Sequence, residues 1–143
     1  MKGFPLSRIP LTLLVDRDLE TLQRAGSAGT VEIISIGKGL SEFLITEGGS
    51  DRTQLAIQWL ESTLREKAPG PVLCTDISLL FEPSLRLDPL VLLRRISRYT
   101  ALIVHWPGEF RNGVLSYAVP EHNHYRHWKD LHGIEIKGVD DAL

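Results

Sequence analysis

Short apolar runs alternate with helix-forming segments along most of this chain, and the alternation constrains the fold more than any other feature. Five runs are expected to form strands: Leu11–Val15, Val31–Ile36, Val72–Phe81 (most securely Val72–Ile77), Ala101–Trp106 and Val114–Val119. Runs that are apolar on both faces are typical of parallel strands with helices on either side of the sheet. The chain is therefore predicted to be an α/β sandwich of three layers, with about five mostly parallel strands and helices on both faces.

The segments between these runs carry helix start and stop signals. Three helices are expected: Asp18–Ala25, closed by Gly26; Asp51 to about Lys67, capped by Ser50; and one that Asp88 and Pro89 begin and that continues to about Arg98. In the second helix, Glu61 is placed to pair with Arg65 one turn further on.

Length, charge and cysteine content limit the class of protein. The chain has 143 residues, which suits a single domain over residues 1–143, with a polar tail from about residue 133. Its 16 basic and 18 acidic side chains give a formal charge of −2 without a block of like charge. The single cysteine, Cys74, lies in an apolar run, and neither a signal peptide nor a spanning helix is evident. We therefore expect a cytoplasmic protein without a membrane partner.

The turn after the first strand lacks the residues that bind phosphate. Val15 is followed by Asp16, Arg17 and Asp18, although a nucleotide-binding α/β domain would carry its glycine-rich phosphate loop at this place. Such a loop needs glycines, so that backbone N–H groups can face the phosphates, and it needs a lysine and a hydroxyl side chain. The two carboxylates would instead repel a triphosphate. We therefore expect no nucleotide cofactor.

One tract, from Thr75 to Arg126, carries a resemblance to a known family. Its marks are LLFEPSL at Leu79–Leu85, the helix start Asp88-Pro89-Leu90, the strand end Trp106-Pro107-Gly108, Tyr117-Ala118, and the ending Pro120-x-His122-x-x-Tyr125-Arg126. In these motifs the chain resembles the C-terminal half of BrxF, the small P-loop accessory protein of BREX bacteriophage-exclusion systems. Upstream the similarity is weaker: Leu13–Leu22 matches the P-loop region, and Ile33–Leu44 and Arg52–Leu60 match the second strand and its helix.

The resemblance implies a P-loop NTPase-like fold in which the phosphate loop is degenerate or deleted. It also implies that Asp76, near the end of the third strand, matches the Walker-B carboxylate that holds magnesium through water. Asp76 can equally be a turn residue bonded to nearby backbone, and the missing phosphate loop favours this alternative. A shift of the match by one residue places Thr75 at the family's acidic position. Asp76 is therefore a weak candidate for cofactor binding.

Other candidate sites have ordinary structural alternatives. Gly37-Lys38-Gly39 follows a strand and precedes a possible helix capped by Ser41, so it is either a truncated anion site or a plain turn. The five histidines, all in the last third, fit no zinc signature, and a solvated or packing role is favoured. Glu109, Glu121 and Asp130 have no spacing that fixes a common face. No catalytic residue and no metal site are predicted; the histidines are His105, His122, His124, His127 and His132.

Two classes of function follow, with a third that is weaker. The first, which we favour, is a non-catalytic adaptor of a BREX-like defence complex, with a large ATPase, a methyltransferase or a phosphatase-like subunit as partner. Aromatic and arginine side chains dominate binding hot spots, so its expected contact residues are Trp106, Pro107, Tyr125, Arg126 and Trp128. Alternatively, these aromatics cover a sheet edge and Arg126 pairs with Glu109 or Glu121.

The second class is an ATPase component completed by a neighbouring subunit. The third is a DNA-binding module, because basic side chains and aromatics in the C-terminal half could contact phosphates and stack on bases. The basic side chains are Arg86, Arg94, Arg95, Arg98, Arg111, Arg126 and Lys129. Arg94, Arg95 and Arg98 fit the solvated face of a helix better than a DNA contact surface.

Overall fold

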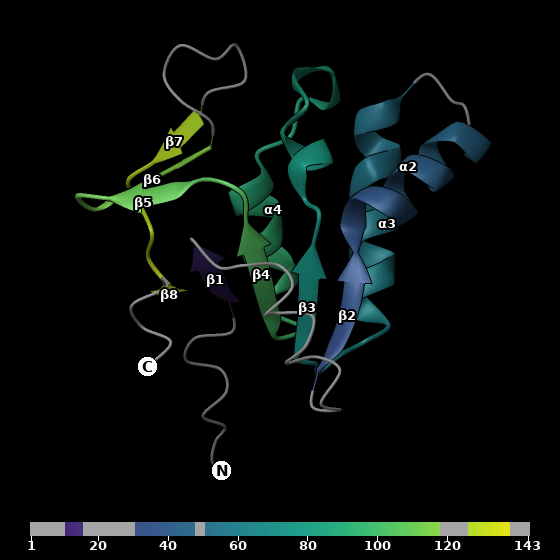
Figure 1. Ribbon diagram of the computed structural model, residues 1–143. Coiled ribbons are helices and arrows are strands. Elements are labelled where there is room, and N and C mark those ends of the chain that lie inside the picture. Colours follow the sequence, from purple (N-terminus) through teal and green to yellow (C-terminus); the bar gives the residue numbers. More distant parts are fainter. Residues whose placement is uncertain (1–10, 16–30, 48–50, 118–125, 138–143) are drawn as a thin grey trace.

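The main sheet has five strands, and every neighbouring pair in it is parallel. The computed structural model describes residues 11–15, 31–47, 51–117 and 126–137. The strand order is β2-β3-β4-β1-β8 (Figure 1). The strands are β1 (Leu11–Val15), β2 (Glu32–Ser35), β3 (Val72–Thr75), β4 (Leu102–Trp106) and β8 (Ile134–Lys137). The predicted α/β class and the mostly parallel five-stranded sheet are confirmed.

The centre of this sheet is built from the first and fourth predicted runs. β1 pairs with β4 over its whole length, from Leu11 opposite Leu102 to Val15 opposite Trp106. Alternate residues of both strands are buried, and β3 beside them is buried throughout. The most apolar runs thus occupy the interior strands, as their burial on both faces requires.

The fifth parallel strand is β8 and not the predicted run Val114–Val119. Over the described residues that run forms β6 (Val114–Tyr117), which lies in a separate antiparallel sheet with β5 (Glu109–Arg111) and β7 (Arg126–Trp128). β8 adds to the free side of β1, with Leu11 opposite Ile134. β8 lies in the segment that was predicted to be a polar tail. An edge strand needs only alternate apolar residues, so its sequence can look polar.

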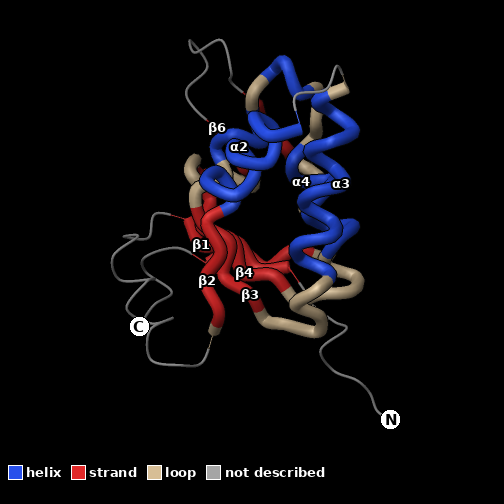
Figure 2. Tube along the Cα trace, turned by 90° about the vertical axis from the view of Figure 1, so that its right-hand side faces the viewer, coloured by secondary structure: helices blue, strands red, loops and turns tan. Residues whose placement is uncertain are grey.

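Two helices cover one face of the main sheet. α3 (Arg52–Arg65) and α4 (Pro89–Ile96) lie side by side on this face, and α2 (Ile36–Glu47) continues upward from the end of β2 (Figures 1 and 2). The predicted helix Asp18–Ala25 lies outside the described residues, so the described helices cover one face of the sheet.

The helix starts agree with the capping signals. The Asp51 side chain accepts a hydrogen bond from the Gln54 N–H at 3.0 Å, and the Asp88 side chain accepts one from the Val91 N–H at 3.1 Å. α4 has Pro89 in its first turn, as predicted, but it ends at Ile96 before Arg98. α3 is capped by Asp51 itself, because the helix begins one residue later than predicted.

The third predicted strand is shorter than its apolar run. β3 ends at Thr75, and the chain continues through two short 3-10 turns, Ser78–Phe81 and Pro83–Leu85. Leu80, Phe81 and Leu85 in these turns are fully buried. A buried strand and a buried turn have similar apolar composition, so the sequence pattern alone could not locate the end of β3.

Candidate functional site

The carboxyl edge of the main sheet is the place where this topology offers a binding site. β1 lies inside the sheet. The strand that follows it in the sequence, β2, lies on one side of it, and the last strand, β8, lies on the other side. In open parallel sheets, ligands bind outside the carboxyl ends of the strands at such a switch in direction. The residues at this edge are Val15 on β1, Thr75 on β3 and Trp106 on β4.

Asp76 is exposed at this edge, directly after β3. Its backbone adopts the left-handed conformation, with φ of 57°, and its carbonyl oxygen accepts a hydrogen bond from the Gly37 N–H at 2.8 Å. The Ser35 hydroxyl donates to one carboxylate oxygen at 3.2 Å. A left-handed aspartate costs about 1–2 kcal/mol, and these contacts to the start of α2 hold it there. The carboxylate keeps acceptor capacity for water or a cation.

Thr75, the alternative match to an acidic position, faces the interior. Its side chain is 3% exposed, and its hydroxyl donates to the Ile34 carbonyl at 3.4 Å. The residue therefore ties β3 to β2 and presents no ligand to the carboxyl edge.

The prediction of a turn at Gly37-Lys38-Gly39 is wrong, because these residues form the first turn of α2. The Ser35 hydroxyl accepts a hydrogen bond from the Lys38 N–H at 3.3 Å, which is the contact of an N-cap side chain. Ser41, the predicted cap, lies inside the helix and donates to the Lys38 carbonyl. The two glycines are required by close packing. A Cβ at Gly37, for example, would lie 2.8 Å from the Asp76 carbonyl oxygen.

Trp106 was expected to contact a partner, but it is buried in an aromatic cluster. Its side chain is 1% exposed, and its indole N–H donates to the Ser116 carbonyl at 3.0 Å. The ring of Phe81 packs edge-on against Trp106, with 5.3 Å between the ring centroids, and Tyr117 stacks on Phe81 with a centroid distance of 4.0 Å. Trp128 completes the cluster, and its ring centroid lies 5.4 Å from that of Trp106. Trp106 is therefore a buried core residue, and the prediction that it contacts a partner is wrong.

Arg126 and Trp128 also bind within the chain. The Arg126 guanidinium donates to the carbonyls of Leu87 and Phe81, the second at 3.3 Å. The Trp128 indole N–H donates to the Asp88 carboxylate at 3.1 Å. Both side chains are half-buried, so they fasten the small sheet to the segment before α4. The alternative of aromatics covering a sheet edge fits this arrangement better than a partner surface does.

The remaining contact and pairing predictions have mixed outcomes. Pro107 is exposed at the end of β4, while Tyr125 and Glu121 lie outside the described residues. Arg126 binds carbonyls, and Glu109 pairs instead with Arg111 at 3.7 Å.

The histidines and carboxylates form no metal site in the described part of the chain. No group of three or more histidine, cysteine, aspartate or glutamate side chains there is placed to hold a metal ion. His122 and His124 lie outside the described residues. The Asp130 carboxylate accepts a hydrogen bond from the His132 N–H at 3.2 Å, so it is bound locally.

Several basic side chains of the C-terminal half are engaged inside the chain. Arg95 forms an ion pair with Glu61, and Arg94 donates to the Asp130 carbonyl at 2.8 Å. The predicted pair of Glu61 with Arg65 is therefore replaced, and Arg65 lies over the ring of Tyr99 at 4.1 Å. These contacts reduce the basic surface available to a nucleic acid.

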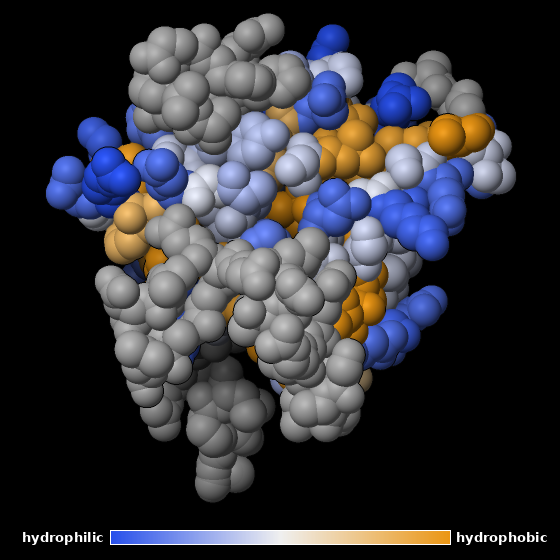
Figure 3. All heavy atoms as spheres, in the orientation of Figure 1, coloured by the Kyte–Doolittle hydropathy of each residue, from blue (hydrophilic) through white to orange (hydrophobic). Residues whose placement is uncertain are grey.

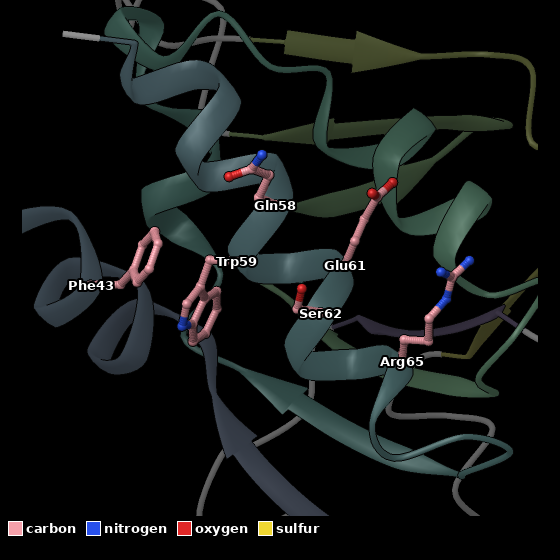
Figure 4. Close-up of a pocket in the computed structure, with 6 residues that line it drawn as sticks. All are labelled: Phe43, Gln58, Trp59, Glu61, Ser62 and Arg65. Atoms are coloured by element: carbon pink, nitrogen blue, oxygen red, sulfur yellow. The ribbon is translucent and has the colours of Figure 1, made fainter. Parts of the chain in front are cut away.

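A hollow of about 430 Å³ lies beside α3, and the sequence pattern did not indicate it. Its lining residues are Phe43, Gln58, Trp59, Glu61, Ser62 and Arg65. Phe43 and Trp59 lie side by side between α2 and α3, whereas Glu61 and Arg65 point toward α4 (Figure 4). Apolar atoms also gather over α2 (Figure 3), where Ile45 is 80% exposed. The one signal for this hollow is the tryptophan on a helix whose other large apolar residues are aliphatic.

Comparison with protein families, with curated proteins and with solved structures finds no match to this chain. Among the described residues, no helix has the length and apolar character needed to cross a membrane.

Proposed function

We propose that this chain is a non-catalytic adaptor of a bacterial antiphage defence complex of the BREX type, and that it acts in the cytoplasm through protein contacts. One observation carries the proposal. β1 occupies the interior of a parallel sheet, as the first strand of a nucleotide-binding domain does, yet Asp16, Arg17 and Asp18 follow it where a phosphate loop would stand. Carboxylates at this place oppose phosphate binding.

The packing supports a role that does not need a nucleotide. Leu11, Leu13 and Val15 on β1 are at most 1% exposed, and the core around them includes residues from both sheets and all three described helices. A fold held by such a core keeps its outer surfaces without a bound ligand. The hollow beside α3 and exposed Pro107 are surfaces that a partner could use.

Affinity purification from the native host tests the adaptor role. The tagged chain is recovered before and during phage infection, and the proteins that purify with it are identified by mass spectrometry. We expect a methyltransferase, a phosphatase-like protein or a large ATPase of the defence system. A Trp59→Ala bait tests whether the hollow is the interface, with Val91→Ala as the control at an exposed apolar side chain outside the hollow. Recovery of the chain alone in both states would contradict the proposal.

A second candidate is a nucleotide-dependent component that a neighbouring subunit completes. It is favoured by Asp76, whose exposed carboxylate stands at the carboxyl edge next to Ser35. Titration calorimetry with ATP and magnesium separates the two functions. The adaptor predicts no binding by the isolated chain. Micromolar binding that Asp76→Ala abolishes would replace the adaptor with the nucleotide-dependent function.

A further inference from the structure

We propose that the free edge of β5 is a self-complementary surface through which two copies of this chain associate. β5 is the edge strand of the small sheet, whose order is β5-β6-β7, and no described strand pairs with its outer side. All three of its residues, Glu109, Phe110 and Arg111, are exposed. An edge of this kind offers backbone N–H and C=O groups to another strand. The inference rests on this geometry and is independent of the proposed function.

The hairpin geometry determines which backbone groups face outward. Asn112 and Gly113 form the two-residue loop, with φ of 54° and 78°, as a type I′ turn requires. Such a loop closes on a hydrogen-bonded pair, here Arg111 with Val114. Because the pairs alternate along antiparallel strands, the next pair, Phe110 with Leu115, is not hydrogen-bonded. The N–H and C=O of Phe110 therefore point away from β6, toward the free edge.

A second copy placed antiparallel and centred on Phe110 meets these groups with its own. The two Phe110 residues then exchange both of their outward hydrogen bonds, and each Glu109 lies opposite Arg111 of the other copy. Glu109 and Arg111 share one face of the strand, whereas Phe110 occupies the other face. The three strands of each copy thus join into one continuous antiparallel sheet.

The charges favour this antiparallel partner over other arrangements. Glu109 and Arg111 side chains are 57% and 76% exposed, and within the chain they meet at 3.7 Å. Directly opposite residues of unlike charge stabilise a strand pair, and residues of like charge destabilise it. A parallel copy in register would set Glu109 against Glu109, so only the antiparallel register satisfies both pairs.

The exposed aromatic side chain adds an apolar contact at the same place. Phe110 is 40% exposed, and on its face of the strand it lies opposite Leu115, which is fully buried. In the antiparallel dimer the two Phe110 rings are cross-strand neighbours, and aromatic pairs of this kind stabilise sheets. Figure 1 shows the β5–β6 hairpin projecting to one side of the main sheet. The contact is short, so the dimer is weak and depends on concentration.

Sedimentation equilibrium between about 10 µM and about 1 mM chain tests the proposal. The mass should rise from 16.0 kDa toward twice that value. Arg111→Glu sets carboxylates opposite each other and should raise the dissociation constant at least about tenfold. Glu109→Arg should do the same by opposing two guanidinium groups. The double variant Glu109→Arg/Arg111→Glu should restore association, and so should an equimolar mixture of the two single variants.

Two further variants separate the edge from general effects of charge. Arg98→Glu changes the net charge by the same amount at an exposed side chain outside β5, and it should leave the dimer unchanged. Phe110→Pro removes the outward N–H without removing a bond to β6, and it should abolish association. A mass of 16.0 kDa over the whole range would overturn the proposal. A dimer that Arg111→Glu does not weaken would overturn it as well.

Discussion

Gly39 allows α2 to pass directly against the ring of Trp59. A Cβ built at this position would lie 2.5 Å from the indole. Alanine would raise helix propensity by about 1 kcal/mol, but the overlap would cost about 1–3 kcal/mol. We expect Gly39→Ala to lower the free energy of unfolding, as measured by urea denaturation.

A double-mutant cycle isolates the role of the ring. In a Trp59→Ala background the overlap disappears, so Gly39→Ala should raise the free energy of unfolding by up to about 1 kcal/mol. The same sign of effect in both backgrounds would show that the indole does not require the glycine.

Cys74 is buried on β3, and burial raises the pKa of its thiol from 9.0 to about 12. The folded thiol therefore stays protonated near pH 8 and should not react with Ellman's reagent until the chain is unfolded. Above about pH 9 the unfolded state loses this proton and the folded state does not. The free energy of unfolding should thus fall as the pH rises through that range, and Cys74→Ala should remove this part of the slope.

Single residues of the candidate site were partly predictable. The burial of Cys74 followed from its apolar run. The position of Asp76 directly after β3 did not, because the predicted strand continued through Asp76 to Ile77. Its left-handed backbone did not follow either, because it arises from the approach of Gly37, a residue of another element. The role of Gly37 and Gly39 was missed for the same reason: a glycine in a turn and a glycine under a neighbouring side chain look alike in a sequence.

At the scale of elements, Asp88 joins α4 to the small sheet. Its carboxylate accepts from the Val91 N–H and from the Trp128 indole, both at 3.1 Å. Asp51 caps α3 at 3.0 Å, and no tryptophan bond to it is present among the described residues. Asp51→Ala should cost about 1 kcal/mol, as cap removal does. Asp88→Ala should cost about 1 kcal/mol more, because the half-buried indole also loses its partner.

Asp88→Asn is the matched control, because the amide oxygen can still accept both bonds. It should recover most of the stability in urea denaturation followed by tryptophan fluorescence. Equal losses in Asp51→Ala and Asp88→Ala would show that the indole bond adds nothing.

Elements were predictable where a local signal marks them. The strand Leu11–Val15 and the cap at Asp88 are of this kind. Asn112-Gly113 is a strong hairpin signal and marks the β5–β6 turn, although β5 itself was not among the expected strands. β8 has no such signal. Ile134 and Ile136 alternate with charged residues, and only their pairing with β1 makes this segment part of the sheet. Membership of a sheet is a long-range property, and the alternation of a four-residue run is weak evidence for it.

At the scale of the molecule, the two sheets share one core through the aromatic cluster. Phe81 comes from the turns after β3, Trp106 from β4, Tyr117 from β6 and Trp128 from β7. Arg126 strengthens the connection from β7 by binding the carbonyls of Phe81 and Leu87. A shared core makes the two sheets unfold together, so circular dichroism and tryptophan fluorescence should give the same urea midpoint.

Phe81 contacts all three of the other rings, so its removal should loosen the small sheet from the main sheet. Phe81→Ala should cost about 3–5 kcal/mol, whereas Phe110→Ala, at a side chain that is 40% exposed, should cost about 1 kcal/mol or less. Hydrogen exchange locates the effect, because amides of β6 and β7 should lose protection more than those of β1 and β4. If Phe81→Ala left β6 and β7 as protected as the wild type, the small sheet would have to be held by its hairpin and Arg126, and the cluster would not be the link between the sheets.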